Sequence, residues 1–179
     1  KDTRINADLP QDRFAFVPPP DTKKIASFDE LLLKTLPPNP LDGKPAPDFT
    51  LSKLDGEEFT LSEEKGKNVV VLDFWATWCP PCQYAMPILE KVMEEYEKKD
   101  VKLIAVNQQE DKPTVQNYLN SQGLDATVVL DKNGRVGSQY RVSGIPQFVV
   151  IDKQGNIVKV LVGVNNFEEN IKRIIDAAL

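Results

Sequence analysis

Residues 69–82 of this 179-residue chain read Val69-Val70-Val71-Leu72-Asp73-Phe74-Trp75-Ala76-Thr77-Trp78-Cys79-Pro80-Pro81-Cys82. The apolar run at the start of this stretch, interrupted only by one acid, predicts a buried β-strand. The two cysteines that follow are the only ones in the chain. Two thiols separated by two residues can close into a disulfide and reopen without unfolding of the chain. The stretch therefore predicts a strand, a turn and a helix, with a two-electron redox couple at the turn.

The composition excludes several classes of protein. A net charge of −5 and a pI near 4.9 argue against binding to nucleic-acid phosphates. No apolar run approaches the ~18 residues that a membrane span needs. The chain contains no histidine, so the usual thiol activator and the usual partner of cysteine at zinc are both missing. We therefore expect neither a metal nor a cofactor, and a thiol chemistry confined to the two cysteines and a partner's thiols.

Residues 43–179 show the hydrophobic patterns of alternating strands and helices. A helix should follow the cysteines as far as about Lys99, with a kink at Pro87. The other expected elements are a hairpin of Phe49–Leu51 and Glu58–Leu61, strands Val101–Asn107 and Thr127–Leu130, a helix from Lys112 to Gly123, a short helix Val136–Val142, a hairpin of Phe148–Ile151 and Ile157–Val162, and a helix Phe167–Ala178. This order predicts an α/β fold whose sheet is parallel across helices and antiparallel at its end, with helices on both faces.

The first 42 residues form a separate, proline-rich zone. Proline removes amide donors, so this zone predicts an extension or linker rather than a central strand. One short helix is expected from Ser27, a plausible N-cap with Glu30 three residues later. We thus predict two parts, residues 1–42 and residues 43–179. Because the chain begins at Lys1 without a methionine, we also expect a processed or shortened piece.

The strand with its Cys-Pro-Pro-Cys motif resembles the thioredoxin superfamily. The segment Gly43-Lys44-Pro45-Ala46-Pro47-Asp48-Phe49 and the hairpin after it resemble the TlpA/ResA-like branch, and Gly144-Ile145-Pro146 matches the superfamily's second landmark. The resemblance covers residues 43–179. It implies a thioredoxin-like three-layer sandwich with a mixed central sheet and an N-terminal β-hairpin. It also implies an extracytoplasmic thiol-disulfide oxidoreductase, in the bacterial periplasm or anchored facing it.

A weaker resemblance lies upstream. The segments Asp8–Pro10, Arg13–Phe16, Pro18–Pro20 and Lys23–Ile25 look like the closing strand of a LolA-like lipoprotein-carrier domain. Such domains are sometimes fused ahead of a TlpA-like domain. The hypothesis is that this chain is the C-terminal part of such a fusion.

The position of Cys79 at the start of a helix favours its thiolate, because the free amides and the helix dipole attract negative charge. A Cys-x-x-Cys arrangement in this setting can lower a thiol pKa from ~8.5 to about 7. We expect Cys79 to be the more exposed thiol and to attack a partner disulfide, after which Cys82 resolves the mixed disulfide. The alternative is a structural disulfide without catalytic role.

Asp73 is an acid inside an apolar strand, so burial should raise its pKa. In thioredoxins the matching acid accepts a proton from the resolving cysteine, which implies that role for Asp73 toward Cys82. The alternative is a strand-end carboxylate that faces water. The lysine that partners this acid in thioredoxins is replaced by Ala105, and the glutamate that TlpA/ResA-like proteins often carry is Ala85 here. Asp73 is therefore expected to be the only acid near the thiols.

The resemblance also predicts the substrate-binding surface. It implies a cis peptide bond before Pro146, which would expose the backbone of Ile145 to an extended substrate peptide; a trans turn proline is the alternative. Trp78 is expected to belong to the docking surface and Trp75 to pack beneath it, although aromatic side chains of this kind often serve packing alone.

The direction of electron flow depends on the residues between the cysteines. Pro80 and Pro81 remove two amides that could stabilise a thiolate, and no histidine separates the cysteines, so a reducing or intermediate potential is expected rather than a strong DsbA-like oxidant.

The expected partners are protein thiols or disulfides and a membrane-linked reductant, and the chain is expected to be a monomer. The alternatives are a peroxiredoxin-like peroxidase, which would carry Thr where Ala76 stands, and a non-catalytic thioredoxin-like binding module.

Overall fold

A computed structural model describes residues 18–20, 22 and 39–179. The chain divides into two units, residues 1–36 and Pro37–Leu179, and only the second is described as a fold here. The helix expected from Ser27 and most of the LolA-like segments lie outside the described residues. The boundary after residue 42 stays a prediction, as does the LolA-like origin of the segment before it.

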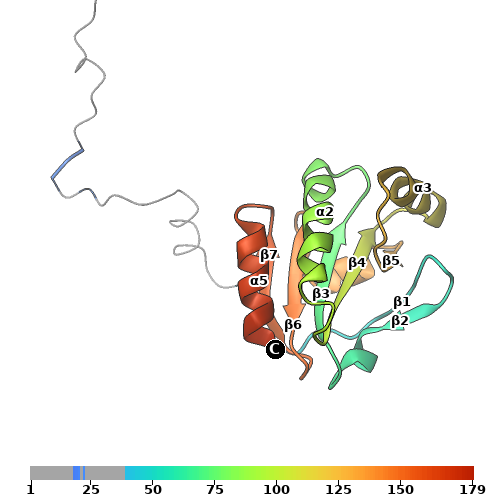
Figure 1. Ribbon diagram of the computed structural model, residues 1–179, viewed down its shortest axis with the longest axis horizontal. Coiled ribbons are helices and arrows are strands. Elements are labelled where there is room, and N and C mark those ends of the chain that lie inside the picture. The colour runs from blue at the N-terminus through green and yellow to red at the C-terminus, as the bar shows by residue number, and fades with distance from the viewer. Residues whose placement is uncertain (1–17, 21, 23–38) are drawn as a thin grey trace, which may run out of the picture. The chain divides into compact units, whose positions relative to one another are not determined.

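Five strands form the central sheet, in the order β5-β4-β3-β6-β7 (Figure 1). Strands β3, β4 and β5 run parallel, whereas β6 and β7 pair antiparallel beside β3. This confirms the predicted change from parallel to antiparallel pairing. The strands are β3 (Val69–Trp75), β4 (Val101–Gln108), β5 (Val128–Asp131), β6 (Gln147–Ile151) and β7 (Ile157–Val162).

The expected N-terminal hairpin is present as a separate two-stranded sheet of β1 (Thr50–Ser52) and β2 (Glu58–Thr60). A short 3-10 helix, η1 (Leu61–Glu64), follows it. An isolated bridge between Lys53 and Val129 ties the hairpin to β5 at the edge of the main sheet. The hairpin therefore covers an edge strand that would otherwise present unpaired backbone groups.

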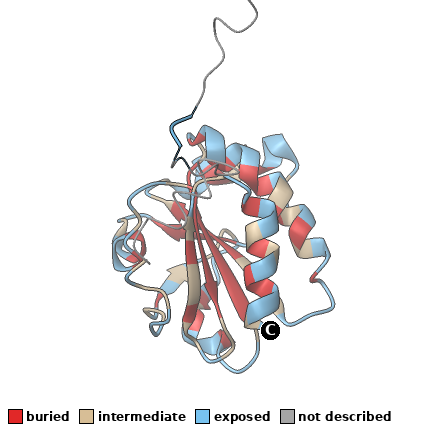
Figure 2. Ribbon diagram, turned by 90° about the vertical axis from the view of Figure 1, so that its left-hand side faces the viewer, coloured by how far each residue is buried: buried red, intermediate tan, exposed pale blue. Residues whose placement is uncertain are grey.

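The helices are α2 (Pro80–Glu94), α3 (Lys112–Gln122), α4 (Arg135–Gln139) and α5 (Phe167–Ala178). Alternate residues of β3 assign them to the two faces of the sheet. Val69 and Val71 pack with residues of α2 and α5, and Trp75 packs with residues of α3. Leu72 and Phe74 point to the other face, toward α4 and the hairpin. Figure 2 shows the buried sheet between these layers, which confirms the predicted three-layer sandwich.

Two helix ends differ from the prediction. Helix α2 ends at Glu94 because the next residues make bonds from each amide to the carbonyl three residues earlier, so the chain tightens into turns before Lys99. Helix α4 is shorter than predicted, and Arg141 just beyond it has φ +51°, which no helix continues. Helix α2 runs through Pro87; the kink there stays a prediction.

The carboxyl end of β3 is a switch point in the topology of the sheet, because the chain continues to opposite sides of this strand. Strand β4 lies on one side of β3 and β6 on the other. In open α/β sheets this kind of position is where sites form. The Cys-Pro-Pro-Cys segment occupies it, since only four residues separate the end of β3 from the start of α2. Within residues 18–20, 22 and 39–179, no helix is long and apolar enough to cross a membrane.

Candidate active site

Cys79 and Cys82 form a disulfide at the start of α2, with an S–S distance of 2.04 Å and a Cα–Cα distance of 5.3 Å. Cys79 is the N-cap residue of the helix, and the amide of Cys82 donates to its Sγ at 3.2 Å. Pro80 and Pro81 occupy the first two helical positions, which need no amide donor. The first free amide of the helix therefore belongs to Cys82, and it points at the sulfur of Cys79.

Both cysteines are buried in this oxidised form. The exposed fraction is 3% for Cys79 and 1% for Cys82. Cys79 is thus only slightly more exposed than Cys82, which weakens the expectation of an open attacking thiol. The residues exposed around the disulfide are Trp78, Pro80 and Pro81. A partner would therefore contact these side chains before it reaches the sulfur atoms.

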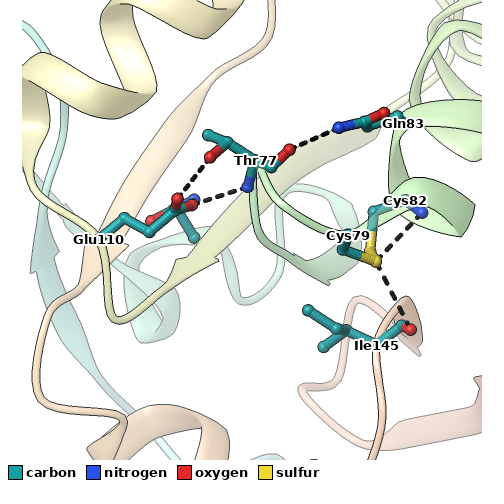
Figure 3. Close-up of a disulfide and its surroundings, with 7 residues drawn as sticks. Thr77, Cys79, Cys82, Gln83, Glu110 and Ile145 are labelled. Atoms are coloured by element: carbon teal, nitrogen blue, oxygen red, sulfur yellow. Dashed lines mark hydrogen bonds between the residues drawn. A yellow bond between two sulfur atoms is a disulfide. The ribbon is translucent and has the colours of Figure 1, made fainter.

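The peptide bond between Ile145 and Pro146 is cis, as the resemblance implied. The carbonyl oxygen of Ile145 lies 3.7 Å from Cys79 Sγ (Figure 3). Ile145 is half-buried and Pro146 is buried, and the carbonyl of Pro146 accepts from the amide of Gly163 at 2.9 Å. A segment 66 residues further along the chain therefore lies against Cys79 of the disulfide.

Asp73 lies in the middle of β3 and is 1% exposed. The alternative of a carboxylate facing water is therefore wrong. Its register partner on β4 is Ala105, and its Oδ1 has no hydrogen-bond partner among the described residues. Burial without a cation raises the pKa of this carboxyl to about 7. Asp73 shares a strand face with Val71 and Trp75, the face that the disulfide-bearing helix covers.

The two tryptophans have opposite environments. Trp78 is 67% exposed, which fits a residue available to a partner. Trp75 is fully buried and its ring centroid lies 5.6 Å from that of Tyr118. Trp75 therefore belongs to the core, which agrees with the alternative that this aromatic side chain serves packing alone. Ala85, where the resemblance implied a glutamate in related proteins, is also fully buried.

One polar residue of the site, Glu110, was not predicted from the sequence. The carboxylate of Glu110 accepts hydrogen bonds from both the amide and the hydroxyl of Thr77, two residues before Cys79 (Figure 3). It also accepts from Asn107 Nδ2 at 2.7 Å. Asp73 is thus not the sole acid at this end of the sheet. Its position in the sequence could have indicated this role. Glu110 follows the carboxyl end of β4, and polar side chains at the carboxyl ends of neighbouring parallel strands lie close together.

Comparison with known proteins agrees with this geometry. The family model described as Redoxin matches residues 41–176. The chain belongs to the Redoxin family. Among curated relatives, the thiol-disulfide oxidoreductase ResA of Geobacillus thermodenitrificans is 37% identical over 135 residues, which are 75% of this chain and 76% of the relative. The ResA of Halalkalibacterium halodurans is 40% identical over 136 residues, which are 73% of this chain and 77% of the relative.

Solved structures agree with the family. A protein of Chlorobium tepidum assigned as the thiol:disulfide interchange protein DsbE superposes with a TM-score of 0.71 at 33% identity, over 76% of this chain and 96% of that one. A thioredoxin-family thiol:disulfide interchange protein of the same organism superposes with a TM-score of 0.65 at 29% identity, over 75% and 94% of the two chains. The chain is a thiol-disulfide oxidoreductase with a Cys-x-x-Cys pair, and its substrates are protein thiols and disulfides.

Proposed function

We propose that this Redoxin protein works as a reductase of protein disulfides, with Cys79 as the attacking and Cys82 as the resolving thiol. The observation that carries the assignment is the Cys82 amide aimed at Cys79 Sγ from 3.2 Å at the start of α2. An amide donor and a helix N-terminus favour a negative sulfur at Cys79 over one at Cys82.

The reaction has two exchanges. The Cys79 thiolate attacks one sulfur of a partner disulfide, forming a mixed disulfide and releasing the partner's other sulfur as a thiolate. The Cys82 thiol then loses its proton and attacks Cys79 Sγ, which forms the 79–82 disulfide and releases the partner's second thiolate. Two electrons pass from the Cys79/Cys82 dithiol to the partner, and both partner thiolates take up protons.

Asp73 is proposed as the acceptor of the Cys82 proton. A general base is most effective when its pKa lies near the working pH. The raised pKa of Asp73, about 7, meets that condition, and its unpartnered Oδ1 is free to receive a proton. Its register partner Ala105 and the buried Ala85 of α2 are both uncharged residues.

The substrate surface is proposed to consist of Trp78, Ile145 and Pro146. The exposed indole of Trp78 offers apolar area beside the disulfide. The carbonyl oxygen of Ile145 lies 3.7 Å from Cys79 Sγ, and the backbone here would pair with an extended segment of the substrate next to the substrate's disulfide.

The direction of the reaction is proposed to be reducing. Pro80 and Pro81 leave the Cys82 amide as the nearest helix donor to Cys79, and no histidine in the chain adds positive charge. A weakly stabilised thiolate favours the disulfide and so gives a strong reductant. We further propose an extracytoplasmic location, a membrane-linked reductant as electron donor and a monomeric state, in keeping with the TlpA/ResA-like resemblance.

The test is reduction of a protein disulfide by the pre-reduced chain, with the redox potential measured in the same preparation. The expected potential is nearer to the thioredoxin value of about −270 mV than to the DsbA value of about −120 mV. Cys79→Ser should abolish turnover, and Cys82→Ser should accumulate the mixed disulfide. A potential near the DsbA value, or peroxide turnover faster than disulfide reduction, would replace the proposal with an oxidant or a peroxidase.

A further inference from the structure

We propose that Glu110 is a positioning residue for the attacking thiol, acting through Thr77. The inference rests on the proposed attack by Cys79 and adds a residue that the Cys-x-x-Cys motif does not contain. The relevant structure is the turn that joins β3 to α2. The Cys79 amide donates to the carbonyl of Ala76 at 3.2 Å, which closes a four-residue turn with Thr77 and Trp78 at its centre.

Every hydrogen-bonding group of Thr77 is engaged. Its amide donates to Glu110 Oε2 at 2.7 Å and its hydroxyl donates to Glu110 Oε1. Its carbonyl accepts from Gln83 Nε2 at 2.6 Å. The turn is therefore held from one side by Glu110, the second residue after β4, and from the other by Gln83 in the first turn of α2, as Figure 3 shows.

The segment that carries Glu110 is fixed before and after this residue. Asn107, at the end of β4, donates its Nδ2 to Glu110 Oε2, and Asp111 caps α3 by accepting from the Thr114 amide at 2.9 Å. Gln109 between them has φ +60°, a conformation that costs a non-glycine residue about 1 kcal/mol or more. The backbone bend at Gln109 comes directly before the carboxylate that returns to Thr77.

The consequence falls on the two residues after Thr77. Trp78 is the next turn residue and is directed outward, and Cys79 closes the turn and caps α2. A turn anchored at Thr77 fixes the direction of both side chains relative to an incoming disulfide. Such placement affects rate strongly, because a displacement of about 1 Å from the reacting geometry can cost up to about a hundredfold.

The chain offers a variant that separates hydrogen bonding from charge. In Glu110→Gln the amide oxygen can accept from the Thr77 amide and Asn107 Nδ2, and the amide nitrogen can donate to the Thr77 hydroxyl, which also accepts. Glu110→Gln thus keeps all three contacts and removes the charge, whereas Glu110→Ala removes both. Glu90→Gln is the matched control, because Glu90 also accepts a backbone amide, that of Asp125 at 3.2 Å, from a position further along α2.

The experiment measures kcat and KM for reduction of a disulfide-bonded peptide by the full chain, with dithiothreitol in excess to re-reduce the 79–82 disulfide after each turnover and with melting temperature as the fold check. Glu110→Ala is expected to lower kcat about tenfold, whereas Glu110→Gln stays within about threefold of the unchanged protein. Glu90→Gln should leave both constants unchanged. Loss of activity in Glu110→Ala and Glu110→Gln alike, or less than a twofold effect in Glu110→Ala, overturns the inference.

Two milder variants keep the question open if Glu110→Ala does not fold. Thr77→Val removes only the hydroxyl donor and Gln83→Ala only the opposite contact, and each should lower kcat about threefold. Unchanged kcat in both variants overturns the inference. Its failure is distinguishable from failure of the proposed function, since the latter requires that the unchanged protein itself does not reduce the peptide or that Cys79→Ser still does.

Discussion

Asp73 on β3 and Ala105 on β4 are register partners in the central sheet, so the neighbouring strand offers a methyl group where a cation would neutralise the acid. The carboxyl is 1% exposed, its Oδ1 lacks a hydrogen bond among the described residues, and its pKa is raised to about 7. The acid is therefore a cost to folding whenever it is charged, and its retention in the core fits a chemical use.

The stability of the oxidised protein should fall as pH rises because of Asp73. Its pKa rises from 3.8 to about 7 on folding, so between these values the folded state holds a proton that the unfolded state has lost. The stabilisation is complete below the unfolded pKa and is lost as pH rises through the folded one, by up to about 4 kcal/mol in total. Urea unfolding of the unchanged protein and of Asp73→Asn, from pH 4 to 8, measures the difference.

Asp73→Asn serves as its own reference in this comparison, because the other titrating groups are common to both proteins. The variant should gain stability relative to the unchanged protein as pH rises. A constant difference between the two proteins over this pH range would mean that the carboxyl does not titrate there on folding.

Asp73→Asn should also slow the second exchange. If Asp73 accepts the Cys82 proton, release of the mixed disulfide in the unchanged protein should accelerate as pH rises through about 7, as Asp73 becomes charged. The variant should lose this acceleration and release the partner about tenfold to a hundredfold more slowly at pH 7. Stopped-flow or quenched-flow measurement of partner release checks it.

The first exchange provides the internal control for that experiment. Formation of the mixed disulfide depends on Cys79 and should change far less in Asp73→Asn. Equal slowing of both steps would indicate a general distortion of the site rather than loss of a base at Cys82.

Most of the fold could be predicted from the sequence, because the local sequence patterns favour the same helices and strands that the packed structure contains. The seven-residue run of β3, apolar except for Asp73, predicts a buried strand, and the proline at the start of α3 and the left-handed Gly123 at its end mark the limits of that helix. The helix ends at Glu94 and Gln139 were less predictable, since a change to tighter turns or to a positive φ follows from packing of the next segment.

The candidate site likewise has one part that the sequence predicts and one part that it does not. Cys79, Cys82 and Asp73 are within ten residues of one another, so the chain itself brings them together. Glu110 reaches Thr77 across 33 residues, and only the parallel pairing of β3 with β4 places the two strand ends side by side. Contacts of this kind depend on register, which a single sequence does not reveal.

Trp78→Ala should weaken substrate binding without weakening the fold. Because the indole is 67% exposed, its removal should cost less than about 0.5 kcal/mol of stability. We expect KM for a protein disulfide to rise several-fold, with kcat changed little. Trp75→Phe is the contrasting variant, since Trp75 is fully buried against Tyr118 and its loss should lower the melting temperature instead. An unchanged KM in Trp78→Ala would remove this residue from the docking surface.

Pro81→His should make the couple more oxidising. Pro81 is an exposed residue in the first turn of α2, so the substitution is sterically tolerated, and the helix retains its N1 proline, Pro80. The new side chain would add a donor and, below its pKa, a positive charge near the Cys79 sulfur, which stabilises the reduced form. Each ~1.4 kcal/mol of such stabilisation raises the potential by about 30 mV.

Equilibration with a glutathione redox buffer measures the shift in potential. The control is Pro81→Gln, which adds a donor without charge and so separates the effect of the hydrogen bond from that of the charge. A potential that stays constant or becomes more negative in Pro81→His would show that the motif's prolines do not set the direction of electron flow.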